Sequence, residues 1–124
     1  MPSVTLVGDA MSGKTHALLN LAAVEAQAGR TVVYVANQQR DAVYAFERFT
    51  SHHVDGVDQV YRARGQERVR YTSGGTVRFY GAGRWGSSNL DTTDVLLLDG
   101  LNDYRLCADP LVGYPDIRVY RTSL

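Results

Sequence analysis

The sequence predicts an α/β fold with a mostly parallel sheet, and three observations lead to that prediction. Short apolar runs alternate with helical patterns in the first half of the chain, which is the order of strand–helix–strand units. The run 31–36 is apolar nearly throughout, as expected for a strand covered on both faces. The run 94–100 is the most apolar of all, with an aspartate near each end. We expect residues 1–124 to form a single domain.

The predicted elements of the first half follow in order. Residues 4–7 are a short run with β-branched members and are predicted to form a strand. Residues 14–28 have a wide apolar surface and are predicted to form a helix, which Gly29 ends as a C-terminal cap. Residues 31–36 form the second strand. A second helix is predicted from Arg40, over residues 40–52.

The second half has fewer helical patterns. Apolar residues within 57–61 are spaced as on a helix and predict a short helical segment. Residues 69–81 contain two alternating strands around a Ser-Gly-Gly turn, which predicts a β-hairpin. The apolar strand 94–100 follows, and residues 101–109 are predicted to form a helical turn or two. Residues 117–121 are predicted to form the last strand.

Composition and charge exclude several classes of protein. The formal net charge is zero, so the chain as a whole is no general binder of polyanions. Cys107 is the only cysteine, so no internal disulfide is expected, which fits a reducing cytoplasm. The apolar runs, about five residues at most, are too short to span a membrane. No basic segment followed by an apolar run stands at the start, so no signal peptide is expected.

The segment from Gly8 to Thr15 reads GDAMSGKT and matches the phosphate-binding pattern G-x-x-x-x-G-K-[ST]. It lies between a predicted strand and a predicted helix, where backbone N–H groups and the helix N-terminus point at phosphate oxygens. Lys14 is the only lysine of the chain, and its compact ammonium suits the β and γ phosphates better than arginine does. The Thr15 hydroxyl is expected to bind Mg²⁺. The predicted nucleotide-binding residues are Gly8, Asp9, Ala10, Met11, Ser12, Gly13, Lys14, Thr15 and His16.

Asp99 ends the apolar strand 94–100 and is the second acidic feature of interest. A carboxylate at the carboxyl edge of a parallel sheet can hold Mg²⁺ through water, opposite Thr15. The alternative is an aspartate that caps a loop. Asp94 stands at the other end of the strand and is interpreted as a solvated or capping residue.

Together these features resemble the P-loop NTPases over most of the chain, with Asp99 in the Walker B position. Within that group the chain resembles the ATPase core of phage terminase large subunits and related helicases. The segments that carry this resemblance are YVANQQRDAVYAF (34–46), GGTVRFYGAGRWG (74–86) and DVLLLDG (94–100). It implies a three-layer P-loop NTPase fold, Mg²⁺ and ATP or another NTP as ligands, and catalytic roles for Lys14 and Asp99.

One departure from the family pattern limits the expected activity. Such motors usually follow the Walker B aspartate with a glutamate that orients the attacking water, whereas Gly100 follows Asp99 here. No glutamate lies after Glu67, and Asp103 is the nearest later carboxylate. We therefore expect a weak or partner-dependent ATPase in DNA handling, located in the cytoplasm. Two alternatives stay open: a non-hydrolytic module that acts through oligomerisation, and a nucleoside or nucleotide kinase, because GDAMSGKTHALL also resembles the P-loop of thymidine kinase.

Residues 61–85 are rich in arginine and aromatic side chains, and only Glu67 opposes the arginines. One interpretation is a surface that faces DNA, with arginines on phosphates and aromatic rings on bases. The other is a polar hairpin with solvated arginines and core-packed rings. Arg84, or else Arg70, is a candidate arginine finger in a homo-oligomer. The arginines are Arg62, Arg64, Arg68, Arg70, Arg78 and Arg84, and the aromatic residues are Tyr61, Tyr71, Phe79, Tyr80 and Trp85.

Two smaller sets complete the expected site. If the sheet has the ATPase strand order, the last strand inserts beside the first, and its carboxyl end carries either a polar sensor of the γ-phosphate or only a frayed tail. The residues concerned are Arg121, Thr122 and Ser123. The candidates for contact with the nucleotide base, by position alone, are Gln38, Gln39 and Tyr44.

Overall fold

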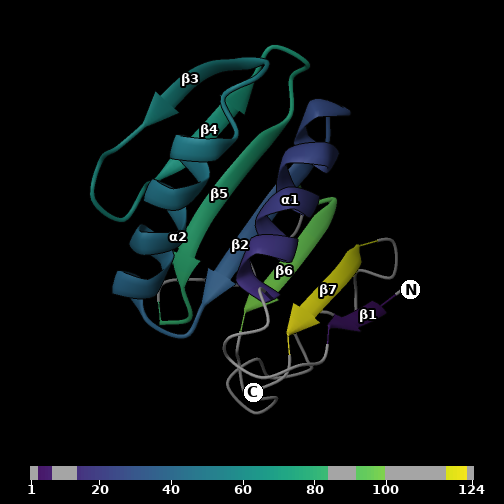
Figure 1. Cartoon of the computed structure of the whole chain (residues 1–124), viewed down its shortest axis with the longest axis vertical. Coiled ribbons are helices and arrows are strands. Elements are labelled where there is room, and N and C mark those ends of the chain that lie inside the picture. Colours follow the sequence, from purple (N-terminus) through teal and green to yellow (C-terminus); the bar gives the residue numbers. More distant parts are fainter. Residues whose placement is uncertain (1–2, 7–13, 84–91, 100–116, 123–124) are drawn as a thin grey trace.

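A seven-stranded sheet with two helices packed on it forms the molecule (Figure 1). The computed structural model describes residues 3–6, 14–83, 92–99 and 117–122. The elements are β1 (Ser3–Leu6), α1 (Lys14–Gln27), β2 (Thr31–Ala36), α2 (Gln39–His52), β3 (Val57–Tyr61), β4 (Arg68–Tyr71), β5 (Thr76–Gly81), β6 (Val95–Asp99) and β7 (Arg118–Thr122). Neither helix within these ranges is long and apolar enough to cross a membrane. The predicted helical turns at 101–109 lie outside the described residues.

The strand order is β1-β7-β6-β2-β5-β4-β3. The first five strands of this order run parallel, and β4 and β3 add an antiparallel edge. The predicted α/β fold with a mostly parallel sheet is therefore confirmed, together with the hairpin of β4 and β5. The last strand, β7, lies between β1 and β6, as the ATPase strand order requires. The carboxyl ends of the five parallel strands consequently meet at one edge of the sheet.

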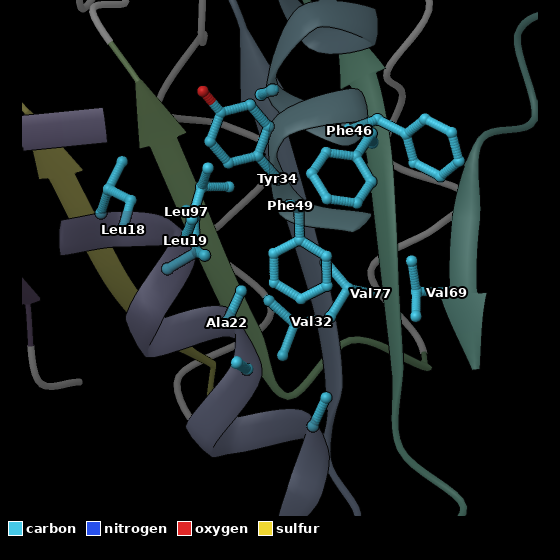
Figure 2. Packing of buried hydrophobic residues seen from close by; sticks show 14 of the residues in the cluster. Leu18, Leu19, Ala22, Val32, Tyr34, Phe46, Phe49, Val69, Val77 and Leu97 are labelled. Carbon is cyan, nitrogen blue, oxygen red and sulfur yellow. The ribbon is translucent and has the colours of Figure 1, made fainter. Parts of the chain in front are cut away.

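Both helices cover the same face of the sheet (Figure 1). Beneath them α1, α2 and alternate strand residues form the larger core cluster, which includes Phe46 and Phe49 (Figure 2). The rings of both phenylalanines pack on Phe79. Side chains on the opposite face are also buried, Val33 and Leu96 among them. Strands β2 and β6 are thus covered on both faces, which explains their continuous apolar sequences. The described residues supply the sheet and one helical layer of the predicted three-layer arrangement.

The β4–β5 turn is packed directly against the end of α1. The Ser73 hydroxyl donates to the Ala26 carbonyl oxygen over 2.6 Å. A Cβ atom on Gly75 would lie 1.9 Å from the same oxygen, so only glycine fits there. Gly29 ends the helix with φ +90° and donates its N–H to Ala26 over 2.9 Å, as its predicted role as a cap requires. This contact holds the hairpin against α1, the helix that begins at Lys14.

The predicted short helix within 57–61 is wrong, because these residues form strand β3. This strand pairs antiparallel with β4, and its register shifts between Val57 and Gln59. Without β3, the backbone N–H and C=O groups on the outer edge of β4 would lack partners. The valines and tyrosine of this segment also favour a strand, and the helix-like spacing of three residues is too short a signal to outweigh pairing.

Candidate functional site

The candidate site lies at the carboxyl edge of the sheet, where β2 and β6 end and α1 begins. In the register of the sheet Ala36 pairs with Asp99, which ends β6. The Thr15 hydroxyl, in the first turn of α1, donates to Asp99 Oδ2 over 2.7 Å. The structure thus brings together two residues that lie 84 positions apart and were predicted to share a site. A hydroxyl and a carboxylate are hard oxygen ligands of the kind that Mg²⁺ prefers, so this pair fits that ion.

Tyr34 is a site residue that sequence reasoning missed. It belongs to β2, and its hydroxyl donates to the same Asp99 oxygen as Thr15 does. The side chain is 1% exposed, its ring packs on Phe79 at 5.4 Å, and its hydroxyl points away from the core cluster (Figure 2). Burial, reinforced by the charge of Asp99, raises the pKa of Tyr34 well above its usual range. Tyr34 is therefore a buried hydroxyl donor to the Asp99 carboxylate.

A cavity of about 340 Å³ opens beside these groups. Thr15, Tyr34 and Asp99 line it from α1 and the sheet, and the exposed face of α2 lines it from the other side. The residues from α2 include Asp41, Tyr44 and Arg48. We call this cavity the Asp99 cleft. It combines two carboxylates, a guanidinium and three hydroxyl groups around one space, which is an arrangement suited to a polar, phosphorylated ligand with a metal ion.

Of the three candidates for contact with a base, only Tyr44 lines the Asp99 cleft, and it is 67% exposed. The Gln39 side chain serves the fold instead. Its Oε1 accepts the Gly81 N–H over 3.0 Å, and its Nε2 donates to Glu67 over 3.4 Å. Gln38 is the exposed N-cap of α2. Of the predicted base contacts, only the one by Tyr44 therefore has a place at the cleft.

For several predicted site residues the structure describes either the backbone alone or nothing. Lys14 begins α1, and Arg121 and Thr122 belong to β7, whose carboxyl end lies at the same edge as that of β6. The residues that lie wholly outside the described ranges are Gly8, Asp9, Ala10, Met11, Ser12, Gly13, Arg84, Trp85, Gly100, Asp103 and Ser123. Their roles, including that of Arg84 as an arginine finger in a homo-oligomer, stay predictions from the sequence. His16 is exposed in the first turn of α1.

The arginines of the hairpin region fall into two groups. Arg68, Arg70 and Arg78 line one cavity of about 260 Å³ with Tyr61, and we call these three residues the arginine face. They alternate along β4 and β5 with core residues, so they lie on the side of the sheet away from the helices. Arg62 is apart from them, because it pairs with Glu47 over 3.5 Å.

The arginine face concentrates positive charge. Arg68 lies directly opposite Arg78 in the register of β4 and β5, an arrangement of like charges that weakens a sheet. The Arg68 guanidinium lies over the Tyr61 ring, 4.1 Å from its centre. The Arg78 Nε is buried and has no hydrogen-bond partner among the described residues. No acidic side chain is among the described residues that line this cavity, so an anion would relieve the repulsion.

The interpretation that the aromatic residues of this region stack on bases is wrong for two of them. Tyr71 and Phe79 are each 1% exposed and belong to the core beneath the helices. Alternation along the strands places them on the face opposite the arginines. Tyr61 and Tyr80 are half-buried, which leaves them as the described rings that could meet a ligand.

Comparison with known proteins identifies the architecture. No protein-family model matches the chain, and no curated protein matches it in sequence. Among solved structures, the ATPase domain of the large terminase of Thermus phage P74-26 matches with a TM-score of 0.68 and 19% identity. A point mutant of that domain matches with a TM-score of 0.66 and 19% identity. Each match covers 98% of this chain and 59% of the other. This chain has the fold of a terminase-like ATPase core.

Proposed function

We propose, from the premise of a terminase-like ATPase fold, that this domain binds a nucleoside triphosphate with Mg²⁺ in the Asp99 cleft. The observation that carries the proposal is the hydrogen bond from Thr15 to Asp99, at the edge where the GDAMSGKT segment leads into α1. Residues 8–16 would bind the phosphates, with Lys14 on the β and γ groups. Thr15 and Asp99 would hold Mg²⁺, which neutralises phosphate charge when bound.

The chain's own groups prepare this site before any ligand arrives. Tyr34 and Thr15 donate to one oxygen of Asp99 from two different elements, which fixes the direction of the carboxylate. A fixed carboxylate loses little freedom when it binds a cation, and such preorganisation favours binding. We propose ATP hydrolysis that is slow, or that depends on a partner, because Gly100 follows Asp99 where related motors carry a glutamate.

Thermal unfolding with nucleotide tests the binding proposal. ATP with Mg²⁺ should raise the midpoint of unfolding, because a ligand at 100 times its Kd adds about 2.7 kcal/mol to the stability. The Asp99→Asn variant keeps a similar shape and both hydroxyl partners but loses the charge. Asp99→Asn should raise the Mg²⁺ concentration that gives half of the nucleotide-induced rise in the unfolding midpoint by at least tenfold. Nucleotide binding in the absence of Mg²⁺ should change little. An unchanged Mg²⁺ dependence would remove Asp99 from the metal site.

We further propose that the domain acts in DNA handling and that the arginine face contacts the phosphate backbone. Support comes from the positive cavity of Arg68, Arg70 and Arg78, which no acidic side chain of the described residues lines. Arginine binds phosphate through two parallel hydrogen bonds, and each phosphate contact adds to the salt dependence of binding. Arg62 and Arg64 are exposed and outside this cavity, so they serve as controls within the same segment.

DNA binding at several salt concentrations tests this second part. Arg70→Ala should weaken binding for all sequences alike and lower the slope of log K against log salt by about 1. Arg64→Ala, which removes the same charge outside the cavity, should change the slope less. Phosphate release should be measured with and without DNA. If DNA neither binds nor stimulates release, the DNA setting is wrong, and the non-hydrolytic oligomerisation module becomes the better account of the nucleotide site.

A further inference from the structure

The proposed hydrolysis needs a group that orients the attacking water, and the glutamates of the chain are engaged elsewhere. Glu25 is buried and pairs with Arg30 and Arg118. Glu67 is buried as well, and its Oε1 accepts a hydrogen bond from Gln39. Glu47 is exposed, pairs with Arg62, and does not line the Asp99 cleft. None of the three glutamates therefore lines the Asp99 cleft.

Asp41 is placed for that role. It lies in the first turn of α2 and lines the Asp99 cleft together with Thr15 and Asp99. We propose that Asp41 is the carboxylate that orients the water attacking the γ-phosphate, in place of the glutamate that the chain lacks after Asp99. This inference rests on the proposed function. Among the described residues that line the cleft, Asp41 and Asp99 are the two carboxylates, and Asp99 is already bound to Thr15 and Tyr34.

The packing of α2 aims Asp41 into the cleft. The buried side of the helix consists of Ala42, Ala45, Phe46 and Phe49, at intervals of three and four residues, and it is anchored on β5 and β2. The exposed side carries Asp41, Tyr44 and Arg48, which line the cleft at the same intervals. A helix held by a buried aromatic core is a rigid support, which is what a water-positioning carboxylate needs.

The Asp41 side chain is also available. It is exposed, and it forms no ion pair or side-chain hydrogen bond with another described residue. Asp41 and Asp99 reach the same cleft from two elements: β6 supplies Asp99, and α2 supplies Asp41.

Asp41 would assist the attack of water on the γ-phosphate of ATP. The oxygen of the water forms a bond to the γ-phosphorus while the bond from that phosphorus to the bridging oxygen breaks. ADP leaves with the electron pair of the broken bond. The proton of the water passes to the Asp41 carboxylate and from there to the released phosphate. A carboxylate that positions and deprotonates water in this way contributes about 10²–10⁴-fold to the rate.

The test compares Asp41→Asn with Asp58→Asn. Asp58 is an exposed aspartate of β3, outside the Asp99 cleft, so this variant controls for the loss of one negative charge. Three quantities are measured with Mg²⁺: the affinity for ADP, the affinity for ADP with fluoroaluminate, and hydrolysis at saturating ATP. Fluoroaluminate mimics the transferring phosphoryl group with water in line, so its binding reports on the water-positioning group even where turnover is slow.

Asp41→Asn should leave ADP affinity within about twofold and lower fluoroaluminate affinity and hydrolysis by about 100-fold. Asp58→Asn should match the wild type in all three. A purely structural role of Asp41 at the start of α2 would move the melting temperature without separating ADP from its fluoroaluminate complex. The inference is overturned if Asp41→Asn retains wild-type fluoroaluminate affinity, or if fluoroaluminate adds nothing to ADP binding in either protein. Failure of the wild type to bind nucleotide would instead refute the proposed function.

Discussion

At the scale of single residues, the Asp99 carboxylate is the meeting point of three elements. It ends β6, and its Oδ2 accepts hydrogen bonds from Thr15 of α1 and Tyr34 of β2. Hydrogen bonds from two elements hold the carboxylate of a third in one orientation. The site is therefore organised by short polar contacts at the end of an otherwise apolar strand.

We predict that Tyr34→Phe weakens the Mg²⁺ site without unfolding the protein. The variant keeps the buried ring and its packing on Phe79, and it loses only the hydroxyl that donates to Asp99. The Mg²⁺ concentration that gives half of the nucleotide-induced thermal shift should rise by about tenfold or more, because one hydrogen bond to a charged group contributes about 1.5–3 kcal/mol and about 1.4 kcal/mol is a factor of ten.

Tyr71→Phe is the matched control for this prediction. Tyr71 is another tyrosine that is 1% exposed, but its hydroxyl meets the His53 carbonyl at 3.5 Å, away from the cleft. This control should leave the Mg²⁺ dependence unchanged. Equal Mg²⁺ dependence in Tyr34→Phe and the wild type would show that Tyr34 only fills the core.

At the scale of elements, the turn between β4 and β5 depends on one close approach. We predict that Gly75→Ala lowers the free energy of unfolding by about 1–3 kcal/mol, because the new Cβ would force the hairpin away from the Ala26 carbonyl of α1. Urea unfolding measures the loss. Gly83→Ala is the control: its Cβ would meet no atom of the described residues within 4 Å, and its free energy of unfolding should lie within about 0.5 kcal/mol of the wild type. Equal free energies of unfolding for Gly75→Ala and the wild type would show that the turn moves away from Ala26 without cost.

The elements with strong local signals could be predicted from the sequence. Strand β2 was predicted over the residues it occupies, since a continuous apolar run with β-branched members fits a central strand. The same holds within a residue or so for α2, whose buried residues recur at helical spacing. Strand β3 could not be predicted in this way. Its residues are mostly exposed, and its structure depends on pairing with β4 rather than on its own pattern.

At the scale of the whole molecule, strand order decides which residues share the site. The pairing of Thr15 with Asp99 was foreseeable, because a phosphate-binding turn and an apolar strand ending in aspartate each have a recognisable pattern. Tyr34 and Asp41 have no such pattern. They join the site because β2 lies beside β6 and because α2 packs its apolar side on the sheet. Sequence spacing carries no information about these contacts until the fold is known.

The Lys14→Ala variant shows whether the segment ending in Lys14 and Thr15 binds the phosphates of a nucleotide. The measurement is thermal unfolding of wild type, Lys14→Ala and the control Arg64→Ala, with and without ATP and Mg²⁺. We predict a nucleotide-induced rise of roughly 10 °C in the wild type and the control, and none in Lys14→Ala, with equal midpoints in the absence of nucleotide. A nucleotide-induced rise that persists in Lys14→Ala would contradict the account.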